Sequence, residues 1–248
     1  MLVLAHGFSE HSGRYQYFAE RLCAAGIAVI ALDHRGHGKS PGRRGHINAM
    51  ADYRGDIGAV INLAEIKWPG IPRVIFGHSM GSLIVLDYVL HHPRGLAGVI
   101  TSGAGLEPAG IATPLTILAA RTLSRIWPTF ALPVKVKAAD LTRDQQEIDC
   151  YNNDPMVHSN GTARWGSEML KAIEWIKQRS GDLDLPILMM HGTSDNLNLA
   201  SGSQNFIAGV SFPDKSLYLY PDCLHELHND LEKEKVLTDL TDWILNHV

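Results

Sequence analysis

The sequence of 248 residues has few cysteines, no basic block and no long apolar run. Its three cysteines, Cys23, Cys150 and Cys223, are an odd number at wide spacings without a C-x-x-C pair, so we expect a reducing compartment. Lysine and arginine total 22 against 26 for aspartate and glutamate, a net charge of 22 − 26 = −4, and nucleic acid is not an expected partner. The apolar runs stay well short of the roughly 20 residues that span a bilayer. The sequence therefore predicts a cytoplasmic protein.

What the chain does contain is the composition of one large α/β domain, with 45% hydrophobic and 19% charged residues. Short aliphatic runs alternate with amphipathic stretches, which is typical of strand and helix units on a mostly parallel sheet. The predicted strands span residues 2–5, 27–32, 74–76, 96–101 and 187–190, with 216–220 as a candidate edge strand. The predicted helices span residues 15–25, 50–66, 80–91 and 230–246. Because the first strand starts almost at Met1, we expect that earlier sheet-edge strands are absent from this chain.

Residues 106–168 interrupt this alternation. An apolar, helix-leaning segment there is punctuated by Pro108, Pro114, Pro128, Pro133 and Pro155. A connection of this length between two strands usually carries function. We therefore predict a core formed by residues 1–105 and 169–248, with a helical cap, or lid, formed by residues 106–168.

The pentapeptide Gly77-His78-Ser79-Met80-Gly81 matches the G-x-S-x-G pattern of a nucleophile elbow, which by itself is a weak signal. Here the aliphatic run Val74-Ile75-Phe76 precedes it and a predicted helix follows, as the strand, tight turn and helix of the elbow require. Gly77 and Gly81 remove side chains where the two backbones crowd. This context indicates Ser79 as a catalytic nucleophile. The alternative is an ordinary strand-to-helix turn with an incidental serine.

A serine nucleophile needs a histidine to take its proton and an acid to orient that histidine. In the α/β-hydrolase fold the three residues follow in the chain order serine, acid, histidine. Asp195 comes four residues after His191, at the end of a predicted strand, and His225 lies in a loop after the last predicted strand. We prefer these two residues by position. Glu107, which also follows a strand, is the alternative acid, and His228 is the alternative base.

The oxyanion hole is expected to use two backbone N–H groups. One belongs to Met80, directly after the nucleophile, and the other to Phe8, in the loop after the first strand. No cofactor is implied. Residues 38–40 read Gly-Lys-Ser but lack the earlier glycine of a phosphate loop, and the histidines of residues 225–228 are three apart where a zinc helix needs four. We expect neither nucleotide nor metal binding.

Six blocks of the sequence, in this order, resemble one known family. They are residues 6–15 (HGFSEHSGRY), 33–40 (DHRGHGKS), 77–81 (GHSMG), 151–155 (YNNDP), 191–195 (HGTSD) and 225–228 (HELH). Together they resemble the monoacylglycerol lipase and lysophospholipase family of α/β-hydrolases, which are hydrolases similar to serine aminopeptidase S33. The resemblance implies esterase or lipase activity on monoacylglycerols, under a cap that forms an acyl-binding channel.

The resemblance also implies a polar pocket for the alcohol part of the substrate. The matching residues are Glu10, Arg14 and His228, with Tyr151 nearby. An alternative for Glu10 and Arg14 is an ion pair at positions i and i+4 of the first helix, worth about 0.3–0.5 kcal/mol. One pair can serve both purposes. The resemblance weakens within residues 106–150, so it says least about acyl preference.

The segment 111–132 of the expected cap is rich in leucine, isoleucine and aromatic residues. Arg121 and Arg125 are its only charged residues. We expect the segment to pack over the active site as the wall of an apolar pocket. Transient contact with a membrane surface is a further prediction.

The sequence thus predicts a hydrolase that cleaves carboxylic esters of lipid-like substrates, monoacylglycerol first, through an acyl-enzyme on Ser79. The alternative within enzymes is a carboxylesterase, lysophospholipase or thioesterase for a small-molecule acyl substrate that is not a glyceride. The alternative from another class is a non-catalytic binding module, whose usual sign would be the loss of a triad residue. Acyl length, head-group preference and oligomeric state are left open by the sequence.

Overall fold

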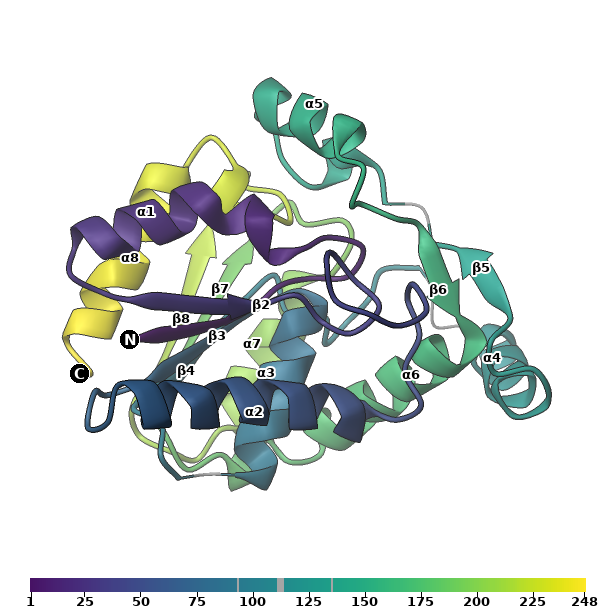
Figure 1. The fold of residues 1–248 in the computed structure, drawn as a ribbon, viewed down its shortest axis with the longest axis horizontal. Coiled ribbons are helices and arrows are strands. Elements are labelled where there is room, and N and C mark those ends of the chain that lie inside the picture. Colours follow the sequence, from purple (N-terminus) through teal and green to yellow (C-terminus); the bar gives the residue numbers. More distant parts are fainter. Residues whose placement is uncertain (93, 111–113, 135) are drawn as a thin grey trace.

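A six-stranded parallel sheet forms the centre of the computed structural model, which describes residues 1–92, 94–110, 114–134 and 136–248 (Figure 1). Its strands are β1 (Leu2–Ala5), β2 (Val29–Leu32), β3 (Val74–His78), β4 (Gly98–Ser102), β7 (Ile187–Gly192) and β8 (Lys215–Tyr220). They lie in the order β2-β1-β3-β4-β7-β8, and every neighbouring pair is parallel. The predicted α/β fold is confirmed, and β8 lies at an edge of the sheet as expected.

Helices cover both faces of this sheet (Figure 1). One face carries α1 (Gln16–Ala24) and α8 (Lys233–Leu245), and the other carries α2 (Met50–Lys67), α3 (Met80–His91) and α7 (Ala200–Gly209). Successive side chains of a strand point to opposite faces. Accordingly, Leu2 and Leu4 pack with the first group of helices, and Val3 and Ala5 pack with the second. A short continuous apolar run is therefore buried on both sides, as parallel sheets require.

The segment after β4 holds two short strands and several helices. They are α4 (Pro114–Ile126), β5 (Ala131–Pro133), α5 (Gln145–Asn153), β6 (Asn160–Thr162) and α6 (Ala163–Lys177). β5 and β6 pair antiparallel, α4 packs against α6, and α6 packs against α3. Because α6 continues across residue 168, a single helix joins this segment to the helices on the sheet.

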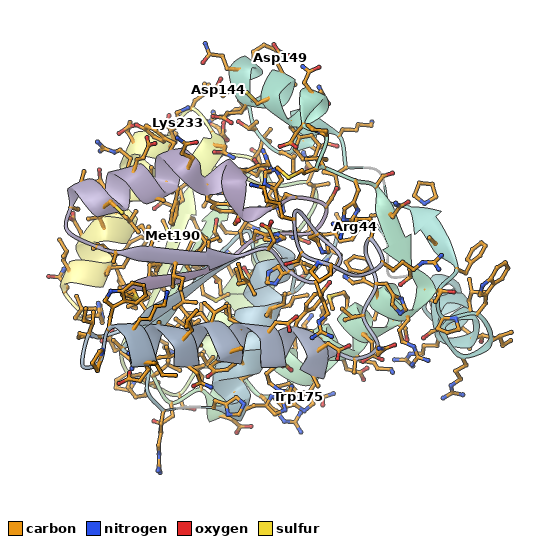
Figure 2. All side chains as sticks on the ribbon, in the orientation of Figure 1. Arg44, Asp144, Asp149, Trp175, Met190 and Lys233 are labelled. Atoms are coloured by element: carbon orange, nitrogen blue, oxygen red, sulfur yellow. The ribbon has the colours of Figure 1, made fainter. Side chains whose placement is uncertain are left out.

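Two ion pairs also join the segment to α8 and the loop before it. Lys233, the first residue of α8, has its Nζ 3.1 Å from Asp144 Oδ2, and Figure 2 labels the two residues near each other. Arg143 Nε donates to Asp230 Oδ1 over 2.9 Å, and Asp230 is fully buried. The segment is thus attached to the sheet layer at α6 and again near α8.

Candidate active site

Ser79 occupies the sharp turn between β3 and α3. Its backbone has φ 52° and ψ −115°, in the left-handed half of the map that a serine seldom adopts, and its N–H donates to the Ser102 carbonyl over 2.9 Å. A Cβ atom at Gly77 would collide with the Gly81 carbonyl, and one at Gly81 would collide with the Ala5 carbonyl. Both glycines of the pentapeptide are therefore required by the close approach of β1, β3 and α3.

The acid and base expected from the sequence lie together at the carboxyl ends of β7 and β8. His225 Nδ1 lies 2.7 Å from Asp195 Oδ2, and both residues are buried. The other carboxylate oxygen, Oδ1, accepts the backbone N–H groups of Leu197 and Asn198, each over 2.9 Å. Because the carboxylate accepts at both oxygens, His225 Nδ1 carries the hydrogen, and Nε2 of the neutral ring is free to accept one.

The electrostatics of this pair favour a charged acid and a basic histidine. Burial raises the pKa of Asp195, but the His225 charge and the donors around the carboxylate outweigh burial and hold that pKa well below its ordinary value. Burial lowers the pKa of His225, but the Asp195 carboxylate outweighs it, and the net pKa lies above the ordinary value. The pair has the charge distribution of an acid that stabilises an imidazolium.

The alternative acid and base have other partners. Glu107 accepts a hydrogen bond from the hydroxyl of Ser201 over 3.0 Å, at the start of α7. The ring of His228 is buried and stacks on Tyr15, with 4.6 Å between ring centroids. The geometry therefore favours Asp195 and His225 over these alternatives.

A cavity of about 520 Å³ opens at Ser79, and His225 lines it as well. Phe8 and Met80 also line the cavity. Met80 is the first residue of α3, so its N–H is one of the helix-start amides that have no partner within the helix. Trp165 of α6 contacts both residues, since its ring stacks on Phe8 at 4.2 Å and its Nε1 donates to the Met80 sulfur. Phe8 and Met80, whose amides are expected to bind an oxyanion, thus line the same cavity as Ser79, and one side chain from α6 contacts the side chains of both.

The loop that carries Phe8 is held by a buried histidine. His6 Nδ1 lies 2.7 Å from the Gly7 carbonyl, and Nε2 accepts the N–H of His34 over 3.0 Å. Burial lowers the pKa of His6 to about 4, so the ring is neutral near neutral pH. His6 therefore ties this loop to the loop that follows β2.

One part of the cavity wall is apolar and comes mainly from α4 and α6. Its side chains include Ala120, Leu123, Met169, Leu170 and Ile173. Ala120 and Leu123 are three residues apart on α4, and Met169 and Leu170 lie four and three residues before Ile173 on α6, so each set shares one helix face. They form a surface for a hydrocarbon chain.

Another part of the wall contains Glu10 and Glu226, which form a buried charged cluster with Arg14. Arg14 donates to both oxygens of Glu226, over 2.6 and 2.8 Å, and to Glu10 Oε2 over 2.9 Å. Glu10 Oε1 also accepts the Tyr15 hydroxyl over 2.8 Å. The Arg14 guanidinium lies 4.8 Å above the ring centre of Tyr151, which lines the cavity. Two carboxylates thus share one cation.

The two carboxylates of this cluster have opposite pKa shifts. Burial is the largest influence on both, but the charge of Arg14 and its two hydrogen bonds hold the pKa of Glu226 well below its ordinary value. Burial raises the pKa of Glu10, and the charge of Glu226 raises it further. Arg14 lowers this pKa, but it gives Glu10 a single hydrogen bond and does not outweigh burial. Glu226 is therefore the permanent anion of the cluster.

Within the described ranges, no group of three histidine, cysteine or acidic side chains is arranged to hold a metal ion.

The residues expected to bind the alcohol group differ in their access to the cavity. Glu10 and Tyr151 line it, whereas Arg14 and His228 are not among the described residues that do so. Glu10 and Arg14 do form the i, i+4 ion pair of the alternative interpretation, and it is buried. Glu10 precedes the short 3-10 helix Ser12–Tyr15, so the pair does not lie on α1. Glu226 lines the cavity and was missed, although its position directly after His225 was a signal that could have found it.

Comparisons with known proteins identify the family that this chain resembles. The sequence model of the family described as serine aminopeptidase, S33 matches residues 1–232. A monoacylglycerol lipase of Mycolicibacterium smegmatis is 36% identical, over 100% of this chain and 89% of that protein. The monoglyceride lipase of Homo sapiens is 29% identical, over 98% of this chain and 82% of that protein.

Two solved structures are similar in fold over the whole chain. The crystal structure of Paleococcus ferrophilus monoacylglycerol lipase has a TM-score of 0.93 at 29% identity and covers 100% of this chain and 94% of that one. A soluble variant of monoglyceride lipase from Saccharomyces cerevisiae, in complex with a substrate analog, has a TM-score of 0.89 at 25% identity and covers 100% of this chain and 86% of that one. The fold is that of an α/β-hydrolase.

The chain belongs to the serine aminopeptidase S33 family of hydrolases and is similar to its monoacylglycerol lipases. The family resemblance predicted from the six sequence blocks is thereby confirmed.

Proposed function

We propose that the chain hydrolyses the ester bond of monoacylglycerols, releasing a fatty acid and glycerol. The observation that carries the proposal is one cavity in which Ser79 and His225 lie beside both an apolar wall and a cluster of carboxylates. A monoacylglycerol needs both surfaces, because its acyl chain is apolar and its glycerol is a polyol. The names of the relatives support this choice of substrate.

The proposed reaction uses five groups. His225 Nε2 takes the proton of Ser79, whose oxygen attacks the ester carbonyl, and Asp195 stabilises the imidazolium that forms. The N–H groups of Phe8 and Met80 bind the oxyanion, each worth about 3 kcal/mol. The imidazolium then protonates the departing glycerol oxygen. Water attacks the acyl-enzyme by the same steps, with His225 as base and then acid.

The charged cluster favours a substrate with a neutral head group. Glu10 and Glu226 offer hydrogen-bond acceptors to the cavity, and Arg14 is already engaged by both. Hydroxyl groups of glycerol can donate to these oxygens, whereas a phosphate would face uncompensated negative charge. We propose that Glu10, Glu226 and Tyr151 contact the glycerol and that Arg14 acts by orienting the carboxylates. A role for His228 stays a prediction from the resemblance.

Residues 106–168 are proposed to act as the cap, together with the rest of α6. Leu123 of α4 and Met169 of α6 line the cavity, and Trp165 contacts the side chains of Phe8 and Met80. The segment therefore contributes both acyl contacts and support for the expected oxyanion site.

Labelling with a fluorophosphonate probe tests the nucleophile. The wild-type protein is expected to form one covalent adduct on Ser79, and the Ser79→Ala variant is expected to form none while keeping the wild-type circular dichroism spectrum. An unlabelled, correctly folded wild-type protein would favour the non-catalytic binding module.

Relative rates on four acyl compounds test the substrate class. We expect kcat/KM to be highest for a long-chain monoacylglycerol. It should be lower for p-nitrophenyl butyrate, and lower for an acyl-CoA and a lysophosphatidic acid with the same acyl chain as the monoacylglycerol. Turnover of short esters alone would favour a carboxylesterase. Equal rates on the glyceride and the lysophosphatidic acid would contradict the role of the carboxylates.

Membrane contact through α4 is proposed as an addition to this activity. Residues 111–113 lie outside the described residues, but Leu118, Ile126 and Trp127 are exposed at the surface. Within the described residues, no helix is long and apolar enough to cross a bilayer. All three cysteines are free thiols. The cytoplasmic location stays a prediction.

Vesicle flotation compares two equally exposed isoleucines. Ile126 on α4 is 79% exposed and Ile66 on α2 is 78% exposed. Ile126→Asp is expected to weaken binding to phosphatidylcholine vesicles roughly tenfold or more, since inserting one such side chain is worth about 1.5–3 kcal/mol. Ile66→Asp is the control and should change nothing. Equal binding of both variants and the wild type would remove membrane contact from the proposal.

A further inference from the structure

A second histidine, His191, contacts the carboxylate of Asp195 and is not among the described residues that line the cavity. It lies near the end of β7 and is fully buried. Its Nε2 is 3.1 Å from Asp195 Oδ2 and 2.9 Å from the carbonyl oxygen of Asn198. Its Nδ1 is 2.8 Å from the hydroxyl oxygen of Ser203 on α7. His191 therefore connects α7 to the acid of the candidate triad.

The partners of His191 determine which ring nitrogen carries hydrogen. The Asn198 carbonyl can only accept a hydrogen bond, and the Asp195 carboxylate is also an acceptor. His191 Nε2 must therefore carry a hydrogen, which it shares between these two oxygens. In the neutral ring, Nδ1 then accepts a hydrogen bond from the hydroxyl of Ser203.

This assignment gives Asp195 four donors. Oδ1 accepts two backbone N–H groups, and Oδ2 accepts one N–H from His225 and one from His191. The two imidazoles share one oxygen. The His191 N–H thus fixes the rotation of the carboxylate and withdraws negative charge from the oxygen that faces His225.

We propose that His191 is a positioning residue for the reaction, which orients Asp195 and limits the basicity of His225 through their shared carboxylate oxygen. The inference rests on the proposed triad. A histidine with a purely structural role would need only its bonds to Ser203 and to the Asn198 carbonyl. The third contact, to Asp195 Oδ2, is the one that connects His191 to the chemistry.

Two substitutions separate these roles. In His191→Gln the side-chain amide N–H can take the place of ring Nε2 and still donate to Asp195. In His191→Asn the shorter amide lies where Nδ1 was, so the contact with Ser203 can persist while the donor to Asp195 is lost. The pair therefore isolates the hydrogen bond of interest.

We expect His191→Asn to lower kcat roughly 10- to 100-fold with little change in KM, and His191→Gln to recover most of that loss. In the asparagine variant the carboxylate holds more charge for His225, so the pKa of His225 rises further. The acidic limb of the kcat/KM profile should then move to higher pH, and the glutamine variant should move it back. Thermal unfolding of each variant checks that it is folded.

Equal loss in both variants with an unmoved acidic limb would overturn the proposal, as would wild-type kinetics in both. If neither variant folds, Ser203→Ala decides. Removal of the hydroxyl donor makes the His191 N–H a weaker donor, so a smaller shift of the acidic limb to higher pH supports the proposal and no shift overturns it. Absence of fluorophosphonate labelling in the wild type would instead remove the triad itself, which distinguishes the two failures.

Discussion

The two parts of the cavity wall are built by different means. The apolar part comes from side chains that share one face of α4 or α6, such as Leu123 and Met169. The polar part joins residues far apart in the chain, because Glu10 and Glu226 both bond to Arg14. An apolar side chain on a helix face can be replaced by another of similar volume. In the charged cluster, Arg14 stabilises the charges of both carboxylates and they stabilise its charge, so none can be replaced alone. We therefore expect substitutions in the two parts to affect different properties.

The largest effect should follow from removal of the shared cation. Arg14→Met leaves Glu10 and Glu226 as neighbouring buried carboxylates, so we expect the free energy of unfolding to fall by about 3–5 kcal/mol at pH 7. Without Arg14 the folded-state pKa values of both carboxylates rise, so the loss should shrink as the pH falls and they take up protons. Urea unfolding at pH 7 and pH 5 measures both effects.

The control for this substitution is Arg21→Met. Arg21 pairs with Glu234 over 3.1 Å, but the two side chains are 45% and 57% exposed. Exposed pairs contribute less than about 1 kcal/mol, so the control should be nearly as stable as the wild type. A similar loss in both variants would show that the buried cluster is not special.

An intermediate effect is expected from the apolar part. Ile173→Trp adds volume to the face of α6 that lines the cavity, so we expect kcat/KM for long-chain monoacylglycerols to fall roughly 10- to 100-fold. Short-chain esters should be hydrolysed at close to the wild-type rate. Steady-state kinetics over a chain-length series measures this, with the exposed Ile66→Trp as the control. A uniform loss at every chain length would contradict an acyl role for this face.

The smallest effect is the response to pH, which acts through His225 and involves neither part of the wall. His225 must be neutral to accept the Ser79 proton, and its pKa is raised by Asp195. We expect kcat/KM to fall about tenfold per pH unit on acidification, below a pKa higher than the ordinary value of about 6.5. The same limb should appear for short and long esters. A limb that depends on chain length would mean that the apolar part of the wall is coupled to His225.

Much of the fold could be predicted because its signals are local. Each of the six predicted strands is present, since a run such as Val74–Phe76 is apolar on both faces and the sheet is covered on both faces. Helix α7 was missed because Ala200–Gly209 contains few apolar residues, and only Phe206 is a large buried side chain among them. The pairing of β5 with β6 was missed because each has only three residues.

The candidate triad could be predicted because chain order and strand ends bring its members together. Ser79 lies at the end of β3, Asp195 after β7 and His225 after β8, all at the carboxyl edge of one parallel sheet. Glu226 could not be assigned in the same way. Its neighbour His225 could be placed from chain order and from the strand end before it. The partner of Glu226 is Arg14, 212 residues earlier, and no local pattern reveals that contact.

The sequence by itself determined the sheet, the elbow at Ser79 and the family, because periodicity, glycine sterics and motif order are properties of neighbouring residues. Only the tertiary structure decided which residues line the cavity. Glu226 lines it, Arg14 and His228 are not among the described residues that do, and His191 contacts Asp195. These contacts depend on loops from distant parts of the chain that converge at one edge of the sheet, and the loop residues carry no periodic pattern that reveals where they meet.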